Sequence, residues 1–380
     1  MNMKIPGAGQ LQEWFAARLD AILAEVIAIV QVPAPSWDEQ ERALFLEPIM
    51  RSLGLQQVEV DAAANVIGIL PGTGQGPTIL LAAHLDTVFP RGTDLSVTRE
   101  GNKVLAPGIR DNSFGVTSLL WLVRALKELD IKLPGDLICV LTSGEEGLGD
   151  LKGMKAVMAR FHQQVDHVIA VDGGLGGLTT GGITSRRFRV TVKAAGGHSY
   201  GAFGASSAIH SISRMIAAIA DLQVPAKPKT TYNVGVVSGG TSVNSIAATA
   251  EMLIDMRSEK RELLLNLEEQ LMAIINRVAL QDGVEAHPEL LGDRPGGETP
   301  LDHPLVTTIQ GVQQELGIPL STHASSTDAN VAMGYGIPAV CMGCARGGNA
   351  HRTDEWLEID DIPLGLTQLV MTVCRVMTLS

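Results

Sequence analysis

Alternation between short apolar runs and amphipathic helical stretches is the feature that most constrains the fold of this chain. Apolar runs of strand length occupy residues 58–60, 66–70, 78–83, 137–141 and 167–171. Helical periodicity, with apolar residues three and four positions apart, occupies residues 11–30, 39–53, 113–129 and 151–161. Strands that alternate with helices are typical of an α/β sheet covered by helices on both faces. We therefore predict an α/β fold for this part of the chain.

The pattern changes near residue 185. Phe188, Val190 and Val192 alternate as in a strand. They are followed by signals for a helix at about 206–222, strands at 232–237 and 248–256, and a helix at about 260–280. This β-α-β-β-α order indicates a small α+β domain of the ferredoxin-like type. The loop-like segment 292–300 follows, and helix and strand signals then resume.

The length of the chain and this interruption predict two domains. A chain of 380 residues exceeds what one hydrophobic core usually holds. We predict a discontinuous larger domain of residues 1–184 and 296–380, with residues 185–295 inserted as a smaller domain. The glycine-rich run 171–182 suits a hinge between them.

The charge balance excludes some classes of partner. The chain has 29 basic and 41 acidic residues, a formal net charge of −12, and no run rich in Lys or Arg. Nucleic acids and anionic membranes are therefore not expected partners. No segment reaches the ~20 apolar residues that span a bilayer.

The termini and cysteines favour a cytoplasmic location. The N-terminal residues lack the apolar core of a signal peptide. Four cysteines in a chain of this length suit a reducing compartment. Cys341 and Cys344 have C-x-x-C spacing, but no second pair or thioredoxin-like context accompanies them, so we interpret them as structural.

Acids and histidines follow the apolar runs of the predicted sheet. His84 and Asp86 follow the run 78–83, and the others are Asp111, Glu145, Glu146, Asp172 and the late His351. Each has an ordinary interpretation as a helix cap, a solvated turn or a surface loop residue. The carboxyl ends of parallel strands, however, meet at one edge of the sheet. We therefore expect these side chains to lie together.

Crowded carboxylates repel one another unless cations offset them. Two divalent ions ~3.5–4 Å apart would do so, and such a pair needs a bridging carboxylate with further N and O ligands. Of the adjacent glutamates, one suits a metal ligand and its neighbour a base that accepts a proton from water. Asp86 suits the role of holding the imidazole of His84 in one tautomer.

The segments in chain order carry a resemblance to a known family. HLDT at 84–87, RDN at 110–112, SGEEG at 143–147, VDGG at 171–174 and a late G-x-x-H ending at His351 resemble the M20 metallopeptidases, a co-catalytic zinc family. The resemblance extends over nearly the whole chain. It implies a zinc-peptidase-like catalytic domain with a mixed sheet. It also implies two divalent ions per subunit, zinc first, with manganese or cobalt as alternatives.

The resemblance also implies a role for each residue. His84 and Asp172 would bind one ion, Glu146 and His351 would bind the other, and Asp111 would bridge the two. Glu145 would be the general base, and Asp86 would orient the imidazole of His84. The family usually has Asp or Gly after the bridging acid, where this chain has Asn112. That difference leaves the ligand intact and leaves open the local backbone, where the family has a cis peptide.

The inserted domain resembles the lid of the family, which commonly carries the dimer contact and so implies a homodimer. His198, in Gly-Gly-His-Ser, resembles the lid histidine that donates to a developing oxyanion, often from the partner subunit. Asn244 and Arg257 occupy positions that resemble substrate contacts. Arg257 suits a strand-edge salt bridge equally well.

The expected reaction is metal-assisted amide hydrolysis. Aspartate at position 172 in the V-D-G-G context resembles the tripeptidase and dipeptidase branches more than the carboxypeptidase or succinyl-diaminopimelate branches, which tend to have glutamate there. We therefore predict an aminopeptidase that acts on short peptides, with an N-acyl-amino-acid deacylase as the alternative. A catalytically silent metal-binding or peptide-binding protein is the rival from another class.

Overall fold

A mixed β-sheet carries the residues singled out above. The computed structural model describes residues 4–379, and its main sheet consists of β1 (Gln56–Val60), β2 (Val66–Leu70), β3 (Ile79–His84), β6 (Leu137–Thr142), β7 (His167–Leu175), β8 (Gly177–Gly182), β15 (Gly297–Glu298), β16 (Ser321–Ser325) and β17 (Ala339–Gly343). The strand order is β1-β2-β6-β3-β7-β17-β8-β15, with β16 paired to β8. The central strands β6, β3 and β7 are parallel, whereas β2 runs antiparallel to β6. The predicted α/β class with a mixed sheet is confirmed.

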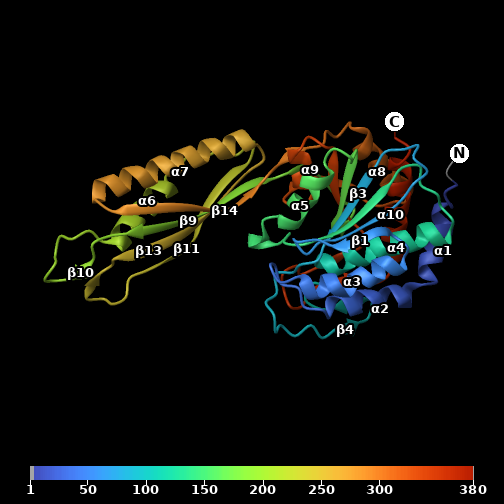
Figure 1. Cartoon of the computed structure of the whole chain (residues 1–380), viewed down its shortest axis with the longest axis horizontal. Helices are drawn as coiled ribbons and strands as arrows, with labels where there is room; N and C mark the ends of the chain where they lie inside the picture. The colour runs from blue at the N-terminus through green and yellow to red at the C-terminus, as the bar shows by residue number, and fades with distance from the viewer. Residues whose placement is uncertain (1–3, 380) are drawn as a thin grey trace. The chain divides into compact units, whose positions relative to one another are not determined.

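Helices cover both faces of this sheet (Figure 1). They are α1 (Ala8–Ala16), α2 (Leu19–Val30), α3 (Gln40–Ser52), α4 (Gly115–Glu128), α5 (Lys152–Phe161), α8 (Pro304–Glu315), α9 (Ala329–Gly334) and α10 (Ile362–Val376). Because strand side chains alternate between faces, Leu81 belongs to one buried cluster, with α4 and α10, and Leu80 to a second, with α5 and α9. Two buried hydrophobic layers therefore pack against the strands and hold their carboxyl ends in place.

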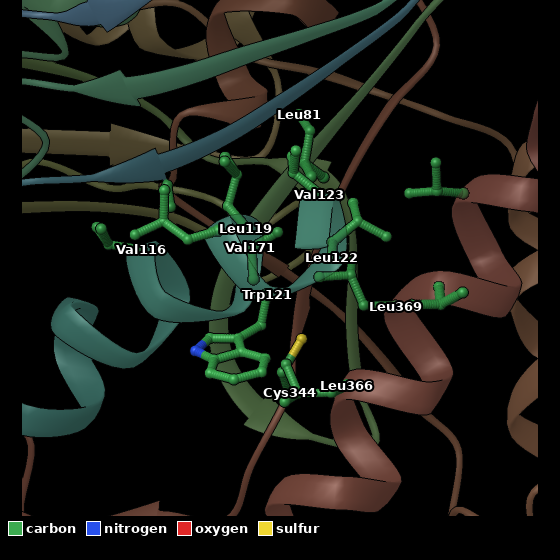
Figure 2. Close-up of a cluster of buried hydrophobic side chains, with 14 of the residues drawn as sticks. Leu81, Val116, Leu119, Trp121, Leu122, Val123, Val171, Cys344, Leu366 and Leu369 are labelled. Carbon is green, nitrogen blue, oxygen red and sulfur yellow. The ribbon is translucent and has the colours of Figure 1, made fainter. Parts of the chain in front are cut away.

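Helix α4 is buried nearly all round its circumference. Figure 2 shows Trp121 and Leu122 of α4 beside Leu366 and Leu369 of α10, with Leu119 toward the sheet. Burying one such leucine side chain stabilises a fold by about 1.5–3 kcal/mol. This helix begins directly after the turn that carries Asp111, so its packing fixes that turn.

A second, four-stranded sheet includes the strand that precedes the turn carrying Asp111. It has the order β18-β19-β5-β4, formed by β4 (Thr98–Glu100), β5 (Lys103–Leu105), β18 (Gly347–Gly348) and β19 (Trp356–Glu358). Strand β19 pairs with β5 and with β18. This pairing brings the loop that contains His351 to the segment that leads into Asp111.

The chain forms two compact units, each with its own hydrophobic core. One comprises residues 4–182 and 298–379, and the other comprises Ile183–Gly297. The second unit contains β9 (Thr184–Lys193), β10 (Gly197–His198), α6 (Ala208–Ala220), β11 (Thr230–Gly239), β12 (Ser245–Ile246), β13 (Thr249–Ser258), α7 (Arg261–Asp282) and β14 (Glu285–Arg294). Its sheet order β11-β13-β9-β14, with two helices packed on it, is ferredoxin-like.

The structure differs from the expectations about three segments. The helix expected over 11–30 is two helices, because the backbone leaves helical geometry at Arg18, whose guanidinium donates to the carbonyl of Trp14. Residues 285–294 form β14, which was not predicted, and the loop expected over 292–300 includes its end. The glycine-rich run expected as a hinge forms the end of β7 and all of β8.

No helix among residues 4–379 combines the length and apolar character needed to cross a bilayer. All four cysteines are buried and unpaired in disulfides. Cys341 donates to the carbonyl oxygen of Asp172 at 3.4 Å, and burial raises the pKa of its thiol well above the usual value.

Candidate metal centre

Strand pairing places the first acids and the first histidine at one edge of the sheet. His84, the last residue of β3, pairs in parallel with Thr142, the last residue of β6. Glu145 and Glu146 follow Thr142 after one turn, and Asp172 lies near the end of β7, the other parallel neighbour of β3. The predicted convergence at the carboxyl ends of the strands is therefore what the backbone produces.

His84 is buried with one ring nitrogen satisfied and the other without a partner. Its Nδ1 lies 3.0 Å from the backbone carbonyl oxygen of Asp86, which only accepts, so Nδ1 carries the proton. Its Nε2 is buried and makes no hydrogen bond within residues 4–379. That nitrogen lies 3.1 Å from Asp111 Oδ1 and 4.0 Å from Asp172 Oδ2. An inward lone pair between two carboxylates is the geometry of a metal ligand.

The second oxygen of Asp111 faces a second group. Asp111 Oδ2 lies 3.5 Å from His351 Nε2, and the same nitrogen lies 3.0 Å from Glu146 Oε1. The sets His84-Asp111-Asp172 and Asp111-Glu146-His351 each bring their ligand atoms within 4.8 Å of one another. Asp111 belongs to both sets, as a carboxylate between two closely spaced ions would.

Glu145 lies beside this pair of sets. With His84 and Glu146 it forms a third set whose ligand atoms lie within 4.8 Å of one another. Its side chain is buried, with 6% exposed. The adjacent glutamates are therefore both at the cluster rather than in a solvated turn.

The pKa values reflect crowding and burial. Burial raises the pKa of Glu146, and burial with the neighbouring charge of Asp111 raises that of Asp172. Burial alone would also raise the pKa of Asp111, but its close contacts with the imidazoles of His351 and His84 lower it. The contact with Asp111 raises the pKa of His351 to about 9. The buried carboxylates repel one another when ionised, and two divalent ions would offset that repulsion.

Asp86 organises several members of the cluster at once. Its Oδ1 accepts from the backbone N–H of Glu145 at 2.8 Å, and its Oδ2 accepts from the N–H of Glu146 at 3.0 Å. Ser36 donates to Oδ2 at 2.6 Å. Burial would raise the pKa of Asp86, but its contacts with His84 and Ser36 lower it, so the group is an anion. Its carboxylate is 3.6 Å from His84 Nδ1, farther than its own carbonyl.

A buried arginine, Arg42, holds the backbone between His84 and Asp86. Arg42 is 1% exposed and donates to the carbonyl oxygens of Leu85 at 2.7 Å and of Val32 at 2.6 and 2.8 Å. Leu85 lies between His84 and Asp86, so this guanidinium fixes the backbone at the exit of β3. Burial lowers the pKa of Arg42 to about 10, which leaves it charged at neutral pH.

Glu355 was not singled out in the sequence, yet it fixes the turn that carries Asp111. It is fully buried, and its Oε1 accepts from the backbone N–H groups of Asp111 at 2.7 Å and Arg110 at 2.9 Å. Its Oε2 accepts from the N–H of Gly108 at 3.1 Å. Burial raises its pKa to about 7. The only sequence signal is its position four residues after His351, in the same loop.

The peptide bond between Asp111 and Asn112 is cis. The Asn112 side chain donates to the carbonyl oxygen of Val171 at 2.9 Å, next to Asp172. A Cβ at Gly115 would lie 2.0 Å from the Asn112 side-chain oxygen, so only glycine fits there. The residue that departs from the family pattern therefore joins the turn to β7.

The remaining candidates lie in the second unit. His198 in β10 pairs with Ser245 in β12, and the N–H of Ser199 donates to the carbonyl of Asn244. His198 Nδ1 accepts from the N–H groups of Tyr200 and Gly201, so the proton is on Nε2, an available donor.

Arg257 is not part of that group. It pairs with Ser185 at the opposite end of β13, and its guanidinium donates to Asp255 at 2.7 Å. This ion pair matches the salt-bridge interpretation of the sequence, although β13 is an inner strand between β11 and β9.

Comparison with known proteins places this architecture in a family. Residues 80–374 match the sequence pattern of Peptidase family M20/M25/M40. The chain is 26% identical to the uncharacterized protein YqjE of Bacillus subtilis over 90% of this chain and 94% of the relative. It is also 26% identical to a succinyl-diaminopimelate desuccinylase of Corynebacterium glutamicum, over 88% of this chain and 91% of that protein.

A solved structure shares the fold. A tripeptidase from Staphylococcus aureus superposes with a TM-score of 0.81 at 22% identity, over 95% of this chain and 99% of that one. The predicted resemblance is thus confirmed by sequence and by fold. The chain therefore belongs to Peptidase family M20/M25/M40, whose members are hydrolases of amide bonds that bind two metal ions.

Proposed function

We propose that this chain is a two-metal hydrolase that cleaves an amide bond in a short peptide or an N-acyl amino acid. The observation that carries the proposal is the position of Asp111, whose two oxygens face His84 and His351 separately. The unpartnered Nε2 of the buried His84 supports it, because a metal ion would complete that nitrogen.

The donor set fits two divalent ions. His84 and Asp172 would hold one, Glu146 and His351 the other, and Asp111 would bridge. Two imidazole nitrogens with carboxylate oxygens and no thiolate fit zinc, manganese or cobalt, and zinc is our first assignment. When bound, the ions would polarise the scissile carbonyl and lower the pKa of the attacking water toward ~7.

Glu145 is the proposed general base. Its carboxylate lies at the cluster, and its backbone is held by Asp86 at 2.8 Å. It takes a proton from the attacking water and delivers it to the leaving amine, which accounts for both proton transfers with one side chain. Asp86 holds His84 through Nδ1 and keeps Glu145 and Glu146 in position.

The second unit supplies the remaining proposed parts. His198 presents an Nε2–H donor, which suits stabilisation of negative charge on the carbonyl oxygen in the transition state. Asn244 is adjacent to it and suits a substrate contact. Arg257 retains its assignment as a candidate substrate contact at the other end of the strand.

A homodimer through the second unit is part of the proposal. Strand β11 is an edge strand of that unit, and Val236 and Val237 on it are 51% and 58% exposed. Exposed apolar side chains on an edge strand favour association with another strand.

The two substrate classes are supported by different observations. The fold shared with a tripeptidase supports a short peptide as the substrate, which agrees with the aminopeptidase predicted from the sequence. The sequence relationship to a desuccinylase supports an N-acyl amino acid. Both reactions need the same cluster, because each breaks an amide bond.

A substrate panel with and without chelator tests the proposal. Purified protein is incubated with dipeptides, tripeptides and N-acetyl amino acids, and amine release is measured. We expect hydrolysis of at least one class, loss of activity after chelation, and recovery on addition of zinc, manganese or cobalt. Hydrolysis that persists at full rate in metal-free protein, or no hydrolysis of any class with two ions bound, contradicts the proposal.

A further inference from the structure

Arg110 is a largely buried cation beside the candidate metal centre that the proposed mechanism does not use. Its side chain is 13% exposed. Within residues 4–379 its guanidinium donates no hydrogen bond, and its Nε is buried without a partner. The nearest acid is Asp111, whose Oδ2 is 4.0 Å from Nη2.

An arginine in this state is incomplete. A guanidinium carries five N–H donors, and a buried donor without a partner, here Nε–H, costs free energy. Arg42, the other arginine near the cluster, is fully buried but places its donors on backbone carbonyl oxygens. The contrast indicates that the partner of Arg110 is a group from outside the chain.

The position of Arg110 is fixed by two contacts. Its backbone N–H is held by Glu355 at 2.9 Å. Its side chain passes over Gly347, where a Cβ would lie 2.4 Å from Arg110 Cδ. The guanidinium lies beside Asp111 Oδ2, the oxygen that also faces His351.

The charge at this position favours an anion. The guanidinium is a cation whose N–H donors are not used by hydrogen bonds within residues 4–379, so an anionic group of the substrate is attracted to it. Guanidinium binds carboxylate through two parallel N–H···O bonds, a geometry that a point charge does not provide.

We propose that Arg110 binds the substrate carboxylate on the carbon next to the scissile nitrogen, and so selects dipeptides and N-acyl amino acids over longer peptides. The assignment rests on the proposed amide hydrolysis at this cluster. The guanidinium lies 4.0 Å from the carboxylate shared by the two ligand sets, close to where the scissile bond would lie. Each additional residue moves a terminal carboxylate away by about 3.8 Å, beyond this guanidinium.

Paired substrates that differ in one charge test the assignment. The probes are N-acetyl-L-methionine, Leu-Gly and Leu-Gly-Gly, each compared with its C-terminal amide. Arg110→Met removes the cation, and Arg110→Lys keeps the charge but loses the planar pair of donors. Arg346→Met is the matched control, because Arg346 lies next to Gly347 and pairs with Asp361 at 3.2 Å on the surface.

The expected result is a loss that depends on the carboxylate. Arg110→Met lowers kcat/KM for N-acetyl-L-methionine or Leu-Gly by about 10- to 100-fold, mainly through KM, and leaves their amides unchanged. Arg110→Lys falls between the parent and Arg110→Met, and Arg346→Met matches the parent. In a Glu145→Ala background, calorimetry shows the same selective loss of Leu-Gly affinity without turnover.

Three results overturn the assignment. In the first, Arg110→Met lowers kcat/KM equally for each carboxylate substrate and its amide. In the second, the loss of kcat/KM is confined to Leu-Gly-Gly. In the third, the variant binds less metal than the parent, which would mean that Arg110 positions Asp111. Failure of the proposed function is distinguishable, because the parent protein itself then hydrolyses none of the six probes.

Discussion

The carboxylate of Asp86 accepts a hydrogen bond from the backbone N–H of Glu145 at 2.8 Å. Its other oxygen accepts from the N–H of Glu146, and its carbonyl oxygen faces His84 Nδ1. One buried acid therefore positions the proposed base and two proposed ligands. Its function extends beyond the orientation of one histidine, which is all that the sequence suggested.

Asp86→Asn should weaken metal binding. The amide nitrogen of Asn cannot accept, so one of the two backbone N–H groups loses its partner and the Glu145–Glu146 turn shifts. We expect affinity for zinc to fall by about 10- to 100-fold, measured by competition with a chromophoric chelator. Asp94→Asn is the control, since that exposed carboxylate also accepts a backbone N–H, from Ser96 at 2.9 Å. Equal affinity in the Asp86 variant and the control would contradict the role given to Asp86.

Glu355→Gln should disturb the bridging position specifically. Its carboxylate accepts three backbone N–H groups of the turn at Asp111, and an amide presents donors to some of them. We expect fewer than two ions to bind per chain and activity to fall at least tenfold, measured by metal analysis after dialysis and by initial rates.

A neighbouring glutamate provides the control for that variant. Glu358 on β19 accepts only the Asn102 side chain, at 2.7 Å, among the described residues. Glu358→Gln should keep the metal content and the activity of the parent. If the two variants behave alike, the turn at Asp111 does not depend on Glu355.

Glu145→Gln should separate metal binding from turnover. The variant keeps the size of the side chain but cannot take a proton, so we expect two ions per chain and a loss of kcat of about 10²- to 10⁴-fold. Metal analysis and steady-state rates on the best panel substrate measure both quantities. Turnover at the parental rate would show that another group transfers the proton.

The stability of the second unit should depend on pH through Asp293. Burial alone would raise the pKa of Asp293, but hydrogen bonds from Arg261 and Arg186 lower it to about 2. A carboxyl whose pKa is lower in the folded state stabilises the fold above its unfolded pKa of about 4, and this stabilisation is lost as pH falls through 2. Discounted for partial exposure, it is about 1–2 kcal/mol at pH 7.

Asp293→Asn should therefore destabilise this unit at pH 7 and much less at pH 2.5. All four tryptophans lie outside residues 183–297, so an unfolding transition seen by circular dichroism but not by tryptophan fluorescence belongs to this unit. Denaturant titrations at both pH values give the difference. An equal loss of stability at pH 2.5 would contradict the ion-pair account.

The alternating apolar pattern predicted the elements with strong local signals and missed those that depend on neighbours. Strand β8 is rich in glycine, yet it is buried between β17 and β16, and Gly181 lies against Ala324, where a Cβ would approach to 3.2 Å. Strand β14 is an exposed edge strand with Pro288 inside it, so its alternation is weak. Pairing across the sheet, rather than local preference, makes both segments strands.

The sequence predicted the site residues that follow the strands of the sheet. It did not predict the residues that position them from distant parts of the chain. His84 and Asp172 directly follow apolar runs and Glu145 follows one after a short turn, so the sheet topology brings them together. Glu355 and Arg42 reach the same place through backbone hydrogen bonds made 244 and 43 residues away. Nothing in their local sequence indicates those partners.

The number of metal ions bound per chain tests the central claim most directly. Protein loaded with zinc and dialysed is analysed for metal, in parallel with Asp111→Asn, which alters the carboxylate shared by both ligand sets. We predict two ions per chain for the parent and loss of at least one in the variant. A parent chain that binds no divalent ion, or an Asp111→Asn variant that retains two with unchanged affinity, would contradict the account.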